Sequence, residues 1–234
     1  MKNSEGNKPV IILATPHNRN NSLEEDLRTF LKDYEILRLC SPKELVLDNI
    51  RKINPIYIFF PHWSWIIPED IFANFECVVF HMTDLPYGRG GSPLQNLIVR
   101  GYKETKLTAL RCVNGLDAGP IYLKRPLSLA GTAEEILQNA SSLIYEMIIE
   151  IVENQPVPVQ QQGEVVVFKR RHPEDGNLAP LGELNKVYDY IRMLDAEGYP
   201  RAFIDTERLH MEFSEAKLDE RYLEAKVRIR SKSS

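Results

Sequence analysis

The sequence predicts an α/β fold built on a mostly parallel sheet, followed by a small α+β appendage. In the first half, short apolar runs of strand length alternate with signals for helix starts. These runs are apolar nearly throughout, as in strands that are covered on both faces of a parallel sheet. After residue 155 the alternation gives way to short strands around one helix. With 43% hydrophobic residues in a chain of 234, a sizeable core can form.

Four apolar runs predict the strands at the centre of the sheet. They are residues 9–14, 34–39, 56–60 and 76–80, and a further strand is expected near 106–112. Repeated strand–helix–strand units imply right-handed crossovers. We therefore expect helices on both faces of the sheet.

Helix starts are marked by four Ser/Thr-x-x-Glu/Gln capping boxes. They begin at Ser22, Ser41, Ser92 and Thr132. Proline at the first helical position supports the second and the third box. The fourth box opens a long helix with one apolar stripe at helical spacing. The stripe consists of Ile136, Ala140, Leu143, Met147 and Ile151.

The chain changes character near residue 155. Residues 155–163 contain two prolines and three consecutive glutamines, which predicts an exposed connection. The elements expected after it are a strand at 165–169, a basic turn, a helix at about 182–195, and strands near 201–204, 208–213 and 223–230. We therefore divide the chain into a catalytic domain, residues 1–163, and a small C-terminal α+β subdomain, residues 164–234.

Charge and cysteine content narrow the classes of partner and the compartment. Twenty-nine basic and 33 acidic side chains give a net charge of −4, which argues against a long polyanion such as tRNA as the partner. The net charge does not exclude a basic pocket for one small phosphorylated ligand.

Cys40, Cys77 and Cys112 are expected to be reduced thiols in the core, and no metal site is expected. Residues 2–8 are polar and predict no targeting signal, so a cytoplasmic location is expected.

The chemistry of an open parallel sheet is expected beyond the carboxyl ends of its strands. His81 ends a buried strand, and Asp117 lies in a later loop between glycines. On neighbouring strand ends the two side chains would form a proton-transfer pair. Each also admits a structural interpretation, as a core histidine and as a turn former. The glycines at 88, 90 and 91 fit no nucleotide-binding spacing; they predict either an anion site at a helix start or a tight turn.

Two segments resemble the signature of the folate-dependent formyltransferases. They are HMTDLPYGRGGSPLQNLI from His81 and VNGLDAGPIYLK from Val113. The family pattern is Asn-x-His-x-Ser-x-Leu-Pro-x-x-Arg-Gly, followed later by Asp-x-Gly. PHWSWIIPEDI, FKRRHPEDGN and VYDYIRMLDAEGYPRAF extend the similarity to residues 8–205. The resemblance implies a Rossmann-like formyltransferase fold, with the bacterial sugar N-formyltransferases of pseudaminic-acid-type pathways as the most similar group.

The resemblance implies formyl transfer from 10-formyltetrahydrofolate to a primary amine, through a tetrahedral oxyanion that needs a hydrogen-bond donor. His81 matches the family histidine and would stabilise the oxyanion. Asp117 matches the family aspartate and would hold the imidazole and accept the amine proton. The positions that would line the folate slot are Trp65, Ile66, Ile67, Thr83, Asp84, Leu85, Pro86, Val113, Asn114, Gly115 and Leu116.

The sequence departs from the family pattern at one position. Val79 stands where the family has asparagine, and a valine side chain cannot donate to an oxyanion. Loss of such a donor costs about 10²–10³ in rate. Asn96 or Asn114 could replace it, His81 could act alone, or the activity is low.

An amino sugar, nucleotide-linked, is the acceptor that the sequence favours. The acidic balance and the short appendage disfavour tRNA. The residues expected to meet the sugar or its diphosphate are Asn18, Arg19, Arg89, Gln95 and Asn96, with Asn20 and Asn21 beside them; a plain surface loop is the alternative for the asparagines. Formyltetrahydrofolate hydrolysis, methionyl-tRNA formylation and non-catalytic folate binding are the alternative functions. The strands expected between residues 201 and 230 can pair across a dimer interface, so the sequence is also compatible with a homodimer.

Overall fold

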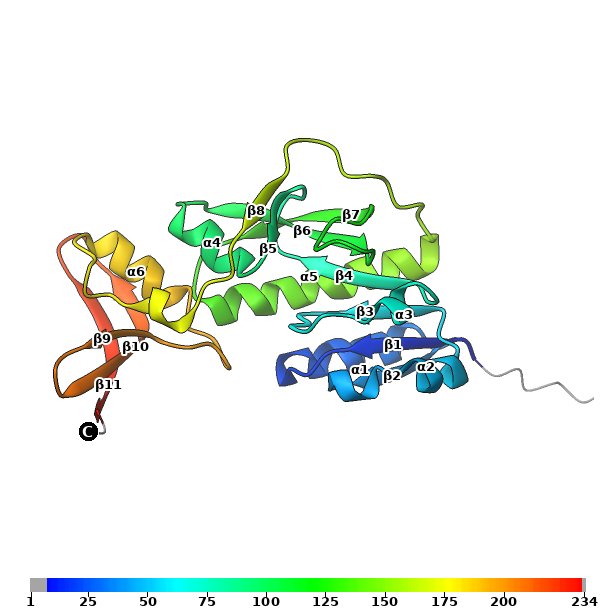
Figure 1. Ribbon diagram of the computed structural model, residues 1–234, viewed down its shortest axis with the longest axis horizontal. Helices are drawn as coiled ribbons and strands as arrows, with labels where there is room; N and C mark the ends of the chain where they lie inside the picture. Colours follow the sequence, from blue (N-terminus) through cyan, green and yellow to red (C-terminus); the bar gives the residue numbers. More distant parts are fainter. Residues whose placement is uncertain (1–7, 233–234) are drawn as a thin grey trace, which may run out of the picture. The chain divides into compact units, whose positions relative to one another are not determined.

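The computed structural model describes residues 8–232 (Figure 1). Contacts between residues divide the chain into two compact units. The first contains the residues up to Arg89, Lys106–Arg125 and Ala140–Val165; the second contains Gly90–Thr105, Pro126–Asn139 and the residues from Val166 onward. Because the units group contacting residues rather than consecutive stretches of chain, the domain boundary after residue 163 stays a prediction.

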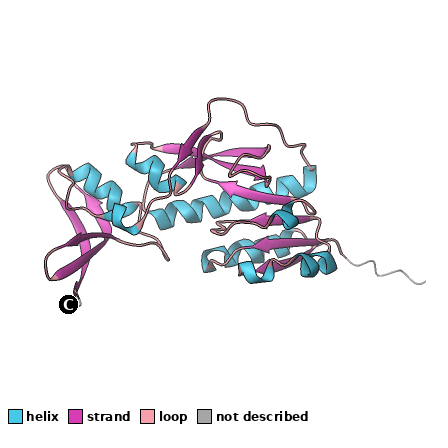
Figure 2. Cartoon of the chain, in the orientation of Figure 1, coloured by secondary structure: helices cyan, strands magenta, loops and turns pink. Residues whose placement is uncertain are grey.

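The central sheet has six strands in the order β2-β1-β3-β4-β6-β7. These strands are labelled in Figure 1, and strands are drawn in magenta in Figure 2. Their bounds are β1 Val10–Ala14, β2 Glu35–Leu39, β3 Tyr57–Phe60, β4 Cys77–His81, β6 Glu104–Arg111 and β7 Ile121–Ser128. The first four are parallel to one another, whereas β6 is antiparallel to β4. The predicted α/β fold with a mostly parallel sheet is confirmed.

The apolar character of the strands follows from burial on both faces. Ile11 and Ile12 point to opposite faces of β1, and both are fully buried. On one side, Ile12 joins Ile58 and Phe60 of β3 in a hydrophobic cluster with Ile71 and Cys77. Such strands cannot alternate apolar and polar residues, because neither face meets water.

The helices and short 3₁₀ turns lie between the strands. Their bounds are η1 Asn18–Asn20, α1 Asn21–Phe30, η2 Pro42–Glu44, α2 Leu47–Ile53, α3 Glu69–Phe72, α4 Pro93–Val99, α5 Ala133–Asn154, η3 Pro173–Gly176 and α6 Leu184–Arg192. Of the apolar stripe predicted in α5, Ile136, Ala140, Met147 and Ile151 are fully buried. Leu143 is only partly buried.

One of the four predicted capping boxes forms as expected. At the start of α5, Thr132 N–H donates to Glu135 at 2.8 Å and Glu135 N–H donates to Thr132 Oγ1 at 3.3 Å. The other three predictions are wrong. Helix α1 begins before Ser22, Ser41 caps only η2, and the Ser92 hydroxyl accepts from Arg171 N–H instead of capping α4. A hydroxyl that accepts from a distant segment is not available to its own helix.

The C-terminal strands form a separate antiparallel sheet in the order β11-β10-β9. Their bounds are β9 Ala202–Asp205, β10 Leu209–Leu218 and β11 Leu223–Ser231, close to the prediction. A two-stranded sheet joins β5 Tyr87–Gly90 and β8 Val166–Phe168. Buried Arg192 of α6 donates to the carbonyls of Leu129 and Gly131, which ties this helix to the start of α5.

Gly90 and Gly91 allow two backbones to approach closely. A Cβ at Gly90 would lie 2.5 Å from Phe168 O, and one at Gly91 would lie 2.6 Å from the Arg170 Cα. Gly91 N–H itself donates to Phe168 O at 3.2 Å. The structure therefore assigns this glycine pair to close packing rather than to an anion site.

The cysteines differ from one another in their surroundings. All three are free thiols, but Cys40 is exposed, so the prediction of a core position is wrong for it. Burial raises the pKa of Cys77 far above its usual range, and burial together with Asp117 raises the pKa of Cys112 to about 11.

No helix within residues 8–232 is long and apolar enough to cross a bilayer. The expected absence of a targeting signal at residues 2–8 falls almost entirely outside the described residues.

Candidate functional site

His81 lies between two hydrogen-bond acceptors. It is the last residue of β4 and is buried. Its Nε2 lies 2.8 Å from Gly88 O, and since a carbonyl only accepts, Nε2 carries a hydrogen. Its Nδ1 lies 3.5 Å from Asp117 Oδ2, which is long for a hydrogen bond but short enough for an ion pair. A ring with hydrogens on both nitrogens satisfies both neighbours.

Asp117 reaches His81 by a route that the sequence does not indicate. Because β6 is antiparallel to β4, Arg111 lies opposite Val78, away from the His81 end of β4. Cys112 N–H donates to Cys77 O, so the following loop leaves the sheet beside the start of β4. The loop must then run back along β4 to bring the carboxylate to the imidazole. The pair forms, but the expectation that neighbouring strand ends bring it together is wrong.

The backbone of this loop is unusual at two places. Asp117 is left-handed, with φ +49°, a conformation that few residues other than glycine adopt. Gly119 packs directly on β6, because a Cβ there would lie 1.8 Å from Arg111 O. Only glycine fits that contact, which fixes where the loop rejoins the sheet.

Gln161 is a residue of this site that the sequence did not reveal. Its Nε2 donates to the carbonyls of Asp117 and Gly119, both at 2.8 Å, and its Oε1 accepts from Arg89 at 2.7 and 3.1 Å. The predicted exposed connection at 155–163 is confirmed for most of its residues, but Gln161 is partly buried and Val159 forms a β-bridge with Ile121. Nothing in a run of three glutamines distinguishes the middle one.

The loop after His81 carries four of the eleven positions predicted to line the folate slot. Thr83, Leu85 and Pro86 are buried, and the Leu85–Pro86 peptide bond is cis. Asp84 forms ion pairs with Lys106, at 2.9 Å, and with Lys124. Burial acts to raise the pKa of Asp84, but the hydrogen bonds and charges of the two lysines lower it below its ordinary value. Asp84 is therefore an anion at neutral pH.

Aromatic and aliphatic side chains are exposed on two loops of the first unit. Trp65, Ile66 and Leu116 are 44%, 82% and 62% exposed, whereas Ile67 is buried. Trp63 packs edge-on against Phe60 and Trp65, with ring centroids 5.6 and 4.9 Å away. Its Nε1 is buried and has no hydrogen-bond partner among the described residues.

The residues predicted to bind the acceptor come from both compact units, and their roles stay predictions. Asn18 is exposed in η1, together with the half-buried Arg19. Asn20 is buried and bonded to Thr15 and Ser141, so its role is structural. Asn21 accepts from Arg38 at 2.6 Å.

Gln95 and Asn96 belong to α4, in the second compact unit. The amide of Gln95 donates to Met193 O at 3.3 Å. Both amide hydrogens of Asn96 are used, by the carbonyls of Gly91 and Lys169. Asn96 is thus no substitute for the oxyanion donor missing at Val79, whereas Asn114 is exposed in the Asp117 loop.

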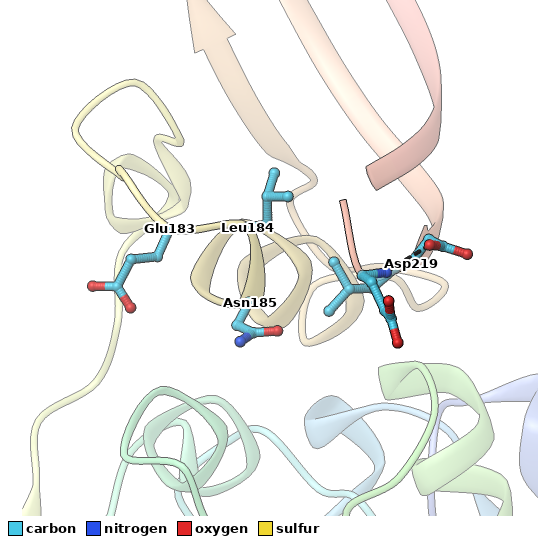
Figure 3. Close-up of a pocket in the computed structure, with 6 residues that line it drawn as sticks. Glu183, Leu184, Asn185 and Asp219 are labelled. Atoms are coloured by element: carbon cyan, nitrogen blue, oxygen red, sulfur yellow. Dashed lines mark hydrogen bonds between the residues drawn. The ribbon is translucent and has the colours of Figure 1, made fainter. Parts of the chain in front are cut away.

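An open depression in the second unit holds none of the predicted site residues. It measures about 650 Å³ and lies at the start of α6 (Figure 3). The lining residues are Glu183, Leu184, Asn185, Leu218, Asp219 and Glu220. Three carboxylates around one opening disfavour an anionic ligand.

Comparisons with known proteins give the family. A model described as "Methionyl-tRNA formyltransferase, C-terminal domain" matches residues 173–230. A solved methionyl-tRNA formyltransferase from Clostridium thermocellum is 49% identical, with a TM-score of 0.93, and the match covers 96% of this chain and all of that one. Aquifex aeolicus HypX in complex with tetrahydrofolic acid shares the fold: 16% identity, TM-score 0.72, 90% of this chain and 38% of that one.

A methionyl-tRNA formyltransferase from Thermodesulfovibrio yellowstonii is 27% identical over 168 residues, which is 67% of this chain and 54% of the relative. The chain spans about half the length of the curated relatives it matches.

These findings overturn two expectations drawn from the sequence. The relatives matched at 27% and 49% identity are methionyl-tRNA formyltransferases, so the expectation that the chain is most similar to sugar N-formyltransferases and acts on an amino sugar is wrong. The exclusion of tRNA from net charge is also wrong, because a whole-chain sum does not say where the charges lie. Because the chain is 49% identical to a solved member, over 96% of this chain and all of that one, it belongs to the formyltransferase family, and within that family it is similar to the methionyl-tRNA formyltransferases.

Proposed function

We propose that this chain transfers a formyl group from 10-formyltetrahydrofolate to the amine of a methionyl-tRNA. The observation that carries the proposal is the His81–Asp117 pair, with Nδ1 and Oδ2 3.5 Å apart. The similarity to methionyl-tRNA formyltransferases supports the choice of acceptor.

The reaction needs one group that takes a proton and one that stabilises negative charge. A bond forms between the amine nitrogen and the formyl carbon, and the bond from that carbon to the donor nitrogen breaks. The amine loses a proton, which Asp117 can accept directly or through water, and the donor nitrogen gains one. His81 can donate from Nε2 to the oxygen that develops negative charge. Nε2 already donates its hydrogen to Gly88 O. The substrate oxygen must therefore share this hydrogen with the carbonyl or take the place of the carbonyl.

The exposed aromatic and aliphatic side chains suit a flat heterocycle. Trp65, Ile66 and Leu116 present apolar surface to solvent. Aromatic and aliphatic side chains are common on the faces of bound heterocycles. The unpartnered indole N–H of Trp63, beside Trp65, gives a polar group that a ligand can satisfy. These residues therefore fit the pterin of the proposed donor.

The acceptor is supported by where the cations lie. Lys226, Arg228 and Arg230 follow each other at every second position of β11, so they point to one face of the C-terminal sheet. All three are exposed. Lys226 is paired with Glu215 at 2.9 Å and Glu212 lies opposite Arg228, so a phosphate backbone would meet these cations beside carboxylates.

Val79 favours a second candidate, a folate-binding protein without transferase activity. It lies two residues before His81 on the same face of β4, where the family has an amide. Substitution Val79→Asn tests its consequence: restoring the donor should raise the transfer rate by up to about 10²–10³-fold if the oxyanion lacks one. Val79→Leu, which has nearly the branched shape of asparagine but no hydrogen-bond donor, serves as the control for packing. An unchanged rate in Val79→Asn would show that another group already fills the position.

The deciding experiment follows loss of the formyl donor in the presence of methionyl-tRNA, of uncharged tRNA or of buffer alone. Loss that requires methionyl-tRNA, with formylmethionyl-tRNA as product, supports the proposal. Formate release without acceptor indicates a hydrolase. Donor binding with no turnover in any arm, and none in Val79→Asn, indicates the non-catalytic protein.

A further inference from the structure

The side chain of Gln161 links the two chain segments that contact His81. One segment contains Gly88, whose carbonyl accepts from His81 Nε2, and the next residue, Arg89, donates to Gln161 Oε1. The other segment carries Asp117, which faces His81 Nδ1 and whose backbone carbonyl accepts from Gln161 Nε2. The contacts therefore form a closed circuit, from the His81 imidazole through Gly88 and Arg89 to the Gln161 amide, and back through Asp117.

The network specifies glutamine rather than another polar residue. Arginine can only donate and carbonyls can only accept, so the neighbours fix which end of the amide faces which. Both amide hydrogens go to carbonyls, of Asp117 and Gly119, and the amide oxygen takes both arginine N–H groups. Glutamate would place an anion against two carbonyl oxygens, and alanine would leave all four partners without their bond.

The Asp117 loop needs such support. A left-handed conformation costs free energy in a residue other than glycine, so contacts must hold it. Gly119 packs on β6, and Pro120 O accepts from Arg111 N–H. Gln161 adds hydrogen bonds to the carbonyls of Asp117 and Gly119. Its own backbone is anchored two residues earlier, where Val159 and Ile121 exchange both bridge hydrogen bonds at 2.7 and 2.9 Å.

We infer that Gln161 is a positioning residue, which keeps the Asp117 carboxylate facing His81 without touching the substrate. The inference rests on the proposed formyl transfer for its effect on rate, but not for its effect on the loop.

The test compares Gln161→Ala and Gln161→Glu with Gln160→Ala and Gln162→Ala, whose side chains are exposed on either side of it. We expect kcat to fall by about 10–100-fold in the Gln161 variants, with KM for the formyl donor within about 3-fold of the wild type. The midpoint of the pH–rate profile should also move, because the contact between carboxylate and imidazole changes. The two control variants should match the wild type.

A second measurement makes the outcome independent of activity. Hydrogen exchange of residues 112–120 should accelerate in Gln161→Ala but not in Gln162→Ala, while exchange in β1 stays unchanged. If the wild type transfers no formyl group, the proposed function fails, and exchange alone decides the inference. If the wild type is active and the Gln161 variants share its kcat, pH profile and loop exchange, the positioning role is refuted. A fall in kcat with an unmoved pH profile would also overturn it.

Discussion

At the scale of single residues, the candidate chemistry depends on a histidine with an acceptor at each nitrogen. Gly88 O fixes a hydrogen on Nε2, and the Asp117 carboxylate favours one on Nδ1. Each contact sets the orientation of the ring that the other requires. The roles of the two residues stay predictions, which substitution can test directly.

Replacing His81 by alanine should abolish formyl transfer and leave most binding of the formyl donor intact, because the slot residues are not altered. Transfer is measured as formylmethionyl-tRNA formed, and binding by quenching of tryptophan fluorescence. His62→Ala, which removes another histidine of the first unit, is the matched control. Full activity in His81→Ala would remove the histidine from the mechanism.

Replacing Asp117 by asparagine keeps the shape of the side chain but removes its charge. We expect transfer to slow by at least about 10²-fold, as for loss of a general base. The pH–rate profile should lose the part in which the rate rises with pH as the Asp117 carboxyl group loses its proton. Asp70→Asn, on the exposed surface of α3, controls for loss of a negative charge. A profile identical to that of the wild type would contradict the proton-transfer role.

At the scale of elements, the loop between β6 and β7 decides whether the pair forms. Gly119→Ala places a methyl group where Arg111 O already lies, so the loop must shift. We expect a loss of about 1–3 kcal/mol in the free energy of unfolding, together with a fall in kcat. Gly182→Ala is the control, because a Cβ there meets nothing within 4 Å. Equal urea midpoints and equal kcat for the two variants would show that the loop adapts freely.

At the scale of the whole molecule, the distribution of charge matters more than its sum. If β11 contacts phosphates, binding of methionyl-tRNA should weaken linearly on a plot of log K against log salt concentration. Arg228→Ala and Arg230→Ala should each reduce that slope by about 1. Arg51→Ala, in α2 of the first unit, should leave it unchanged. Equal slopes for all three variants would place the acceptor elsewhere.

Local patterns predicted β1 to β4, β6, β8 and the C-terminal strands, but not β5 or β7. Apolar runs become β1 to β4 because consecutive residues such as Ile11 and Ile12 point to opposite faces of the sheet and are both buried. A strand of this kind is therefore visible in the sequence as a continuous apolar run. The capping box failed at Ser22 because α1 begins one residue earlier, at Asn21, and at Ser92 because its hydroxyl accepts from a distant segment. Ser92 is held by Arg171, 79 residues away in the chain.

The sequence by itself determined the layered α/β fold, the C-terminal strands, and the identity of His81 and Asp117 as a candidate pair. It could do so because strand periodicity and the motif residues are local properties of the chain. Only the tertiary structure decided how the pair meets, since the antiparallel direction of β6 and the amide of Gln161 are set by contacts between distant segments. Net charge misled about tRNA for the same reason: a sum over the chain contains no positions.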